Sequence, residues 1–209
     1  MNSRLDKELN EVYISLLDMA SLTERIMSLL LLSFNGDEKN IKREAEEIEE
    51  DVIAKYREIE RMCVTLLLRY HPVASDLKRI RATTAIIRDL ERIADNALDI
   101  ISEMDYISSS FLYKKTGLDK MCYKVEEMLK LSIKAYIEKD ISLSLEVEKS
   151  DDYVDSFFSN IKKILTQGIR ENVLGSEEAP DLMMIAKYLE RMGDHATNIS
   201  RMVRSENKE

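Results

Sequence analysis

Five carboxylates recur at helical spacing in two separate parts of the chain. Glu91, Asp95 and Asp99 are four residues apart. Because an α-helix turns through about 100° per residue, these three side chains would form one row along a helix. Glu190 and Asp194 repeat the first two positions of that row. Clustered carboxylate oxygens are the ligands that Mg²⁺, Mn²⁺, Ca²⁺ and iron prefer, and zinc also accepts them. The spacing therefore indicates two candidate metal sites.

The two rows belong to an internal duplication. The stretch 90–100 reads L-E-R-I-A-D-N-A-L-D-I and the stretch 189–199 reads L-E-R-M-G-D-H-A-T-N-I, so six of eleven positions are identical at an offset of 99 residues. An acidic segment precedes each copy, because E-E-I-E-E-D-V-I at 46–53 aligns with E-K-S-D-D-Y-V-D at 148–155. Each half is therefore predicted to contain one helix, then an acidic helix, then a helix that carries the acidic row.

The acidic segments add further candidate ligands. In the second copy, four acids fall within an arc of about 100° on the predicted helix. These four acids are Glu148, Asp151, Asp152 and Asp155. The first copy has the weaker version, Glu46, Glu49 and Glu50, with Ile53 at the place of Asp155. Like charges at this spacing destabilise a helix by about 0.2–0.5 kcal/mol per pair, and a bound cation would relieve the repulsion.

A surface explanation competes with the metal hypothesis. Basic residues lie three positions before several of the acids, so the rows could be solvated ion-pair partners worth about a few tenths of a kcal/mol each. These basic residues are Arg88, Arg92 and Lys187. The recurrence of the acidic arc in both halves favours a metal-linked or anion-linked role. His71, before Pro72, is predicted to lie in a loop, and His195 is predicted to pack at the bundle edge rather than bind a metal.

The composition predicts an all-α protein. The 209 residues include only 5 Gly and 2 Pro, and the 44% that are apolar recur in steps of three and four. The net charge of -9 argues against a nucleic-acid binder, and Cys63 and Cys122 indicate neither a disulfide framework nor a thiolate zinc site. The N-terminus is too charged for an export signal, and no apolar run reaches the roughly 20 residues that span a bilayer. We therefore expect a cytoplasmic protein that does not span the membrane.

Breaks in the helical pattern predict six long helices, arranged as two pseudo-symmetric three-helix bundles at 1–108 and 109–209. Gly36 and Asp37 separate the first two helices, Pro72 ends the second, and Pro180 begins the last. We interpret 108–119 as the connector between the bundles. The helices are predicted at about 5–34, 38–70, 76–108, 118–139, 142–171 and 180–204.

The paired segments L-E-R-I-A-D-N-A-L-D-I and L-E-R-M-G-D-H-A-T-N-I closely resemble the repeated signature of the PhoU family of phosphate-uptake regulators. The resemblance covers nearly the whole chain, because both signatures and the acidic helix before each have the expected spacing. It implies a fold of two three-helix bundles, in agreement with the duplication. Ala94 replaces the usual glycine, Asp99 stands where asparagine is common, and Ile53 removes an acid. The first cluster is therefore expected to hold fewer ions or to bind them less tightly.

The resemblance also implies a function, partners and a cofactor. Relatives are cytoplasmic, often dimeric proteins that restrain phosphate uptake by linking the ATPase subunit of a phosphate ABC transporter to a sensor histidine kinase. This chain is accordingly expected to be a homodimeric negative regulator. Family members bind multinuclear metal clusters, with iron or zinc expected before manganese, magnesium or calcium. The ligands implied here are Glu91, Asp95, Asp99, Glu190, Asp194, Glu148, Asp151, Asp152, Asp155 and Glu50.

Two other classes of function stay open at this level. A carboxylate-bridged metalloenzyme, such as a di-iron oxidase or a two-metal phosphatase, could use the same rows, although neither histidine has a glutamate three residues before it as in ferritin-like sites. A metal-free helical scaffold would need the acids only for solubility. The sequence has no glycine-rich phosphate loop and no H-E-x-x-H motif, which favours a regulator without catalytic activity.

Two basic stretches are candidates for contact with acidic partners or anions. One runs from Lys78 to Arg92, and the other is the pair Lys114-Lys115. The alternative is that these cations only balance neighbouring acids, and we favour that interpretation from the sequence alone.

Overall fold

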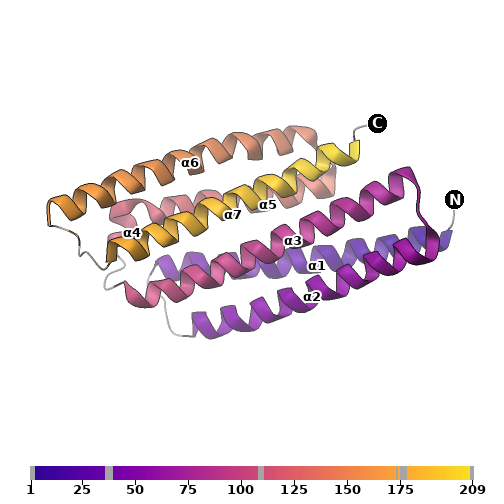
Figure 1. Ribbon diagram of the computed structural model, residues 1–209, viewed down its shortest axis with the longest axis horizontal. Coiled ribbons are helices and arrows are strands. Elements are labelled where there is room, and N and C mark those ends of the chain that lie inside the picture. The colour runs from indigo at the N-terminus through magenta and orange to yellow at the C-terminus, as the bar shows by residue number, and fades with distance from the viewer. Residues whose placement is uncertain (1–2, 36–39, 108–110, 173, 175–177, 208–209) are drawn as a thin grey trace.

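The computed structural model describes residues 3–35, 40–107, 111–172, 174 and 178–207, and within these ranges the protein is all-α without a strand. Six long helices form two three-helix units and run along a common axis (Figure 1). This confirms the predicted architecture. The first unit contains α1 (Ser3–Phe34), α2 (Ile41–Tyr70) and α3 (Ala74–Glu103), and the second contains α5 (Leu118–Glu138), α6 (Ile141–Arg170) and α7 (Glu178–Asn207).

The connection between the units differs from the sequence prediction. The third helix was expected to reach Ser108, but α3 ends at Glu103 and continues as the 3-10 helix η1 (Met104–Tyr106). The connector contains a further short helix, α4 (Phe111–Thr116). Tyr113 of α4 is buried, with its ring edge on Phe34 of α1 at 5.1 Å between centroids. A helix of six residues is too short to show a hydrophobic period, so only this tertiary contact reveals α4.

Three predicted boundary features lie outside the described residues. Gly36 and Asp37, the expected break between the first two helices, belong to this group. So does the proposed domain boundary between residues 108 and 109, and the division of the chain at that point stays a prediction.

Local chemistry explains the helix ends that the structure describes. The Asp140 side chain caps α6, because its Oδ1 accepts hydrogen bonds from the backbone N–H groups of Ser142 at 2.7 Å and Leu143 at 3.2 Å. Gly117 adopts a left-handed conformation, φ 85°, at the start of α5. His71 is likewise left-handed, φ 45°, and Pro72 follows it, so α2 cannot continue. These features turn the chain so that consecutive helices are antiparallel.

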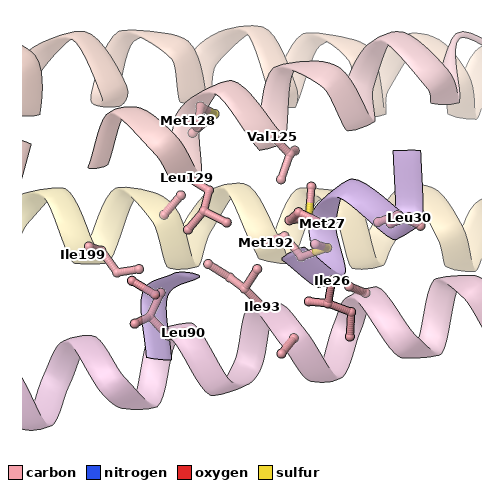
Figure 2. Packing of buried hydrophobic residues seen from close by; sticks show 14 of the residues in the cluster. Ile26, Met27, Leu30, Leu90, Ile93, Val125, Met128, Leu129, Met192 and Ile199 are labelled. Atoms are coloured by element: carbon pink, nitrogen blue, oxygen red, sulfur yellow. The ribbon is translucent and has the colours of Figure 1, made fainter. Parts of the chain in front are cut away.

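One hydrophobic core runs through both units. In Figure 2, Leu90 and Ile93 of α3 lie beside Met192 and Ile199 of α7, and Val125 of α5 packs nearby. All five side chains are fully buried, and burying one such side chain contributes about 1.5–3 kcal/mol. Apolar residues are concentrated on the inward face of each helix. No helix in the described ranges is long and apolar enough to cross a membrane. The contact between α3 and α7 is therefore the central joint of the molecule.

Candidate functional site

Four carboxylates gather between α6 and α7, and we call them the α6–α7 cluster: Asp151, Asp155, Glu190 and Asp194. Asp151 lies at its centre and is half-buried. Burial, followed by repulsion from Asp194 and Asp155, raises the pKa of Asp151 to about 6. The nearby Arg201 guanidinium opposes this shift. Partial burial and Glu190 also raise the pKa of Asp194, although its side chain is exposed at the outer edge of the cluster. The four acids thus repel one another in a partly desolvated place.

A glycine lets α7 approach α6 closely at this point. A Cβ atom added to Gly193 would lie 3.3 Å from Val154 Cγ1 and 3.5 Å from Asp151 Oδ1. Val154 is fully buried, so it has little freedom to move away. The glycine of the L-E-R-M-G-D segment therefore gives the Asp151 carboxylate room directly above the α7 backbone.

A second group of carboxylates lies between α2 and α3, and we call it the α2–α3 cluster: Glu49, Glu91, Asp95 and Asp99. All four side chains are half-buried. Burial, and then repulsion from Asp95 and Glu91, raises the pKa of Glu49. Burial and Asp95 likewise raise the pKa of Asp99, against a hydrogen bond from Tyr188 of α7 that lowers it. The row predicted on the third helix therefore faces an acid of the second helix.

Glu49 is the member of this cluster that the sequence-based site left out. The duplication aligns Glu49 with Asp151, and both are the central, half-buried acids of their clusters. The sequence-based site contained Glu50 instead, which is exposed and only adds to the repulsion on Glu49. The offset of 102 residues between the acidic helices was the signal that could have identified Glu49.

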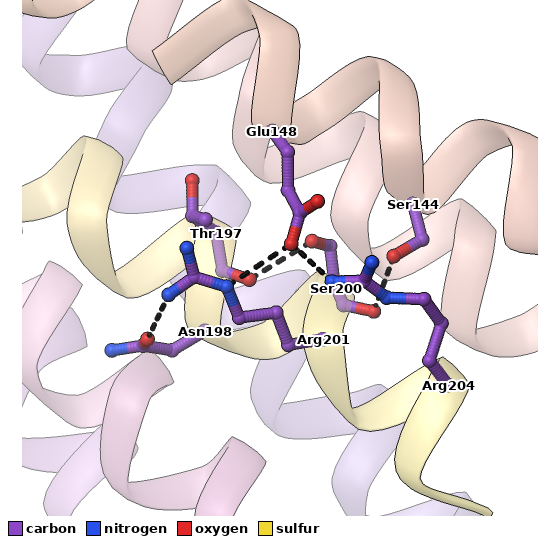
Figure 3. Close-up of polar contacts among 7 residues, drawn as sticks. All are labelled: Ser144, Glu148, Thr197, Asn198, Ser200, Arg201 and Arg204. Carbon is purple, nitrogen blue, oxygen red and sulfur yellow. Dashed lines mark hydrogen bonds and ion pairs between the residues drawn. The ribbon is translucent and has the colours of Figure 1, made fainter. Parts of the chain in front are cut away.

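Two further candidate ligands stay apart from the α6–α7 cluster. Glu148 is held by two arginines of α7 instead, since it accepts hydrogen bonds from Arg201 Nε at 3.1 Å and from Arg204 (Figure 3). Asp152 is exposed, on the outer side of α6. The acids of the arc on α6 therefore have three different environments. Asp151 lies in the cluster, Glu148 is ion-paired, and Asp152 is exposed to solvent. Helical periodicity cannot separate these three environments, because they depend on what α7 places opposite each acid.

Neighbouring cations partly neutralise both clusters, as the surface explanation anticipated. Arg92 lies 3.2 Å from Asp95 Oδ2 and 3.4 Å from Glu91 Oε2, and Lys187 pairs with Glu190. The arginine side chain is 55% exposed, so these pairs are screened by solvent and are individually weak. They do not remove the repulsion at Glu49 and Asp151, whose pKa values are raised in their presence.

Two polar contacts cross the central joint between α3 and α7. His195 Nδ1 lies 2.9 Å from the buried Asp89 Oδ1, and Tyr188 hydrogen-bonds Asp99. His195 is only a quarter exposed and is directed toward Asp89. His195 of α7 therefore lies at the central joint, where it makes a polar contact with Asp89 of α3.

The donor chemistry of both clusters fits a divalent or trivalent cation. All eight side chains offer carboxylate oxygens, which suit hard and borderline metals. Their present orientation does not yet form a site, since no three Asp, Glu, His or Cys side chains of the described residues converge closely enough to hold an ion. Rotation of the exposed carboxylates would be needed to bring their oxygens together. A cation placed there would remove the repulsion that raises the pKa of Asp151 and Glu49.

The chain is similar to known proteins over nearly its whole length. The family model described as PhoU domain matches residues 16–104 and 118–203. The phosphate-specific transport system accessory protein PhoU homolog of Borreliella burgdorferi is 30% identical over 208 residues, which cover 96% of this chain and 93% of that protein. The homolog with the same description from Synechocystis is 31% identical over 213 residues, covering 96% of this chain and 90% of that protein.

Two solved structures resemble the fold closely. The crystal structure of PhoU from Pseudomonas aeruginosa has a TM-score of 0.88 at 25% identity and covers 97% of this chain and 98% of that chain. The crystal structure of the phosphate transport system regulatory protein PhoU from Streptococcus pneumoniae has a TM-score of 0.89 at 21% identity, covering 98% and 97% respectively, and this likeness shows the fold alone.

Proposed function

This chain belongs to the PhoU family, and from that membership we propose that it regulates phosphate uptake as an accessory protein of a phosphate transport system. The observation that carries this proposal is the match of the family model to both halves of the chain. Relatives that align over nearly the full length are named phosphate-specific transport system accessory proteins. The agreement extends beyond a shared helical fold, because the paired acidic signatures lie within the matched residues.

The finer proposal is that the protein acts as a cytoplasmic, homodimeric negative regulator that links the ATPase subunit of a phosphate transporter to a sensor histidine kinase. Binding rather than catalysis is supported by the names of the relatives, which are accessory proteins of a phosphate transport system. The one histidine at the central joint pairs with Asp89. Its regulatory output would then come from docking on partners, and not from turnover of a substrate.

Affinity capture from cells tests this proposal. A tagged chain is recovered after crosslinking from cells of its own organism, grown with abundant phosphate and with scarce phosphate. We expect the transporter ATPase and a histidine kinase to be enriched under abundant phosphate, and deletion of the gene to switch on phosphate-starvation genes in that condition. Recovery of neither component, together with unchanged expression in the deletion strain, would contradict the proposal.

We further propose that the two clusters hold metal ions, iron or zinc in the first place and manganese, magnesium or calcium as alternatives. Asp151, Asp155, Glu190 and Asp194 would hold the ions between α6 and α7. Between α2 and α3, the ligands would be Glu49, Glu91, Asp95 and Asp99. The support is the desolvation and mutual repulsion at Asp151 and Glu49, which disfavour the charged form without a counter-ion. A bound ion supplies the positive charge that keeps these half-buried carboxylates ionised.

Elemental analysis of untagged protein tests the metal proposal. The wild type is expected to carry metal in stoichiometric amount, and the Asp95→Asn, Asp194→Asn double variant to lose most of it. Glu50→Gln with Asp152→Asn is the matched control, because it removes two exposed acids outside the clusters and should retain the metal. Chelation should also lower the melting temperature of the wild type more than that of the double variant, since an ion bound only by the folded state stabilises it. Equal metal content in all three proteins would overturn the assignment.

A further inference from the structure

The turn between α2 and α3 exposes apolar side chains at one end of the molecule. Val73 is 74% exposed and Leu68 is 72% exposed, and Val64 and Leu77 are each 48% exposed. We call these four residues, with the turn that joins them, the α2–α3 tip. The four residues fall within a stretch of 14 residues, and an exposed apolar patch on a soluble protein typically marks a surface that another molecule contacts.

Positive charge accompanies these apolar residues. Residues 61–88 contain six basic side chains and a single acid, Asp76, in a chain whose net charge is -9. The basic residues are Arg61, Arg69, Lys78, Arg79, Arg81 and Arg88. Arg69 pairs with Glu8 of α1 at 3.0 Å, whereas Arg79 and Arg81 are exposed and form no ion pair with another described residue. Within residues 61–88 the cations outnumber the acid, and this local excess of positive charge attracts anions.

The second half of the chain provides an internal comparison. The stretch equivalent to 61–88 at the offset of 99 is 160–187, which contains four basic and four acidic residues. The end of α6 and the start of α7 lie at the opposite end of the bundle from the α2–α3 turn (Figure 1). The duplication therefore produced two structurally equivalent ends, and only one of them is basic.

We propose that the α2–α3 tip docks on an anionic lipid bilayer. The exposed leucine and valine side chains would enter the interfacial region, while Arg79, Arg81 and the neighbouring cations bind the phosphate groups of the lipids. Figure 1 places the turn at the end of an elongated bundle, where a flat surface can approach it. Because the rest of the chain is strongly acidic, contact by this end is favoured over contact by the sides of the bundle.

A groove for an acidic peptide is a less suitable explanation of the same residues. The nearest cavity, of about 620 Å³ between α1 and α2, is lined by Glu8, Glu11 and Glu58 as well as by cations. Those glutamates would repel an acidic partner, and an apolar helix would find few apolar walls. The inference goes beyond the proposed role in phosphate transport, and it agrees with that role because a transporter lies in a membrane.

Sedimentation with protein-free vesicles tests the proposal on the full chain. Vesicles of phosphatidylcholine alone are compared with vesicles that contain about one third phosphatidylglycerol, at low and high salt. We expect binding to the anionic vesicles only, with weaker binding at high salt because the ions screen the charges. The Arg79→Glu, Arg81→Glu variant should bind at least about tenfold more weakly, since each surface cation accounts for about fivefold in binding. Leu68→Gln with Leu77→Gln should also weaken binding several-fold.

Matched substitutions at the opposite end serve as controls. Lys162→Glu with Lys163→Glu changes the net charge by the same amount, and Ile169→Gln removes an exposed apolar side chain. These variants should bind as the wild type does, and circular dichroism should show unchanged folding in every variant. The lipid proposal is overturned by absence of binding to anionic vesicles, by equal binding to neutral vesicles, or by an equal loss in the control variants. It is also overturned if the tip variants keep vesicle binding and lose only capture of transporter components, which would assign the tip to a protein partner. Since the vesicles contain no protein, a negative result leaves the proposed role in phosphate transport untouched.

Discussion

At the scale of single residues, the two halves of the molecule converge on one arrangement. Glu49 and Asp151 are equivalent in the duplication, and each is a half-buried acid with a raised pKa that faces a row of acids on the next helix. The two halves differ at Ile53, which stands where Asp155 adds a further acid in the second half. The α2–α3 cluster lacks that acid but gains Asp99, whose second-half equivalent is Asn198.

The raised pKa of Asp151 predicts a pH-dependent cost to folding in metal-free protein. Its pKa rises from 3.8 to about 6 on folding, so the folded state binds the proton more tightly than the unfolded state. The charged carboxylate therefore destabilises the fold above about pH 6, and this cost disappears as the pH falls from 6 toward 4. Asp151→Asn should be more stable than the wild type by up to about 1 kcal/mol near pH 7.5, a modest gain because the site is partly solvated.

Urea unfolding in the presence of a chelator measures this difference near pH 7.5 and near pH 5. The gain of Asp151→Asn should shrink at the lower pH. Asp152→Asn is the control, since this exposed acid should change stability by less than about 0.5 kcal/mol at either pH. An equal gain for Asp151→Asn at both pH values would show that removal of charge is not its cause.

At the scale of helices, the approach of α7 to α6 is set by Gly193. Alanine is favoured over glycine in a helix by about 1 kcal/mol, but its Cβ would lie 3.3 Å from the buried Val154 Cγ1. These two effects should nearly cancel, so Gly193→Ala is expected within about 0.5 kcal/mol of the wild type. Gly193→Val cannot be accommodated without separating the helices, and it should cost about 2 kcal/mol or more.

Chemical denaturation and elemental analysis together check this prediction. Gly193→Val should lose metal as well as stability, because the displaced helix moves Asp194 away from Asp151. Ala94 occupies the equivalent position in the first half. Ala94→Gly should cost only about 1 kcal/mol through helix propensity and should leave the α6–α7 cluster intact. Wild-type stability in Gly193→Val would mean that α6 and α7 do not depend on this close approach.

At the scale of the whole molecule, the continuous core predicts that the two three-helix units unfold together. Ile93 of α3 and Met192 of α7 are both fully buried at the central joint. Replacing either with alanine should cost about 2–4 kcal/mol. The loss should appear in both units, because each depends on the same interface.

Hydrogen exchange of amides in both units provides the measurement. Met192→Ala should lower the protection of the slowest amides in α2 by about as much as in α6, and thermal unfolding should show one transition. A variant such as Leu143→Ala, on the outer part of the second unit, is the control and should cost less because this side chain is only half-buried. Loss of protection in the second unit alone would show that the units fold independently.

Local sequence signals are enough to predict the helices, the duplication and the acidic rows. Helix formation, capping and the four-residue spacing of Glu91, Asp95 and Asp99 are local properties, so periodicity is enough to predict them. The number and order of the six long helices followed from the same signals, whereas the end of α3 at Glu103 did not. The short helix α4 did not, because its six residues carry no period and its stability comes from the contact of Tyr113 with Phe34.

Which acids face one another depends on how the helices pack. On α6, Asp151 enters a cluster, Glu148 is taken by Arg201 and Arg204, and Asp152 is left in solvent. All three lie in one arc of the helix, and their environments differ because of the side chains that α7 places opposite them. Glu49 lies in the α2–α3 cluster and Glu50 does not, again because of how α3 packs against α2. A helical period gives the direction of a side chain from its own axis, whereas the register between helices comes from packing of residues far apart in the sequence.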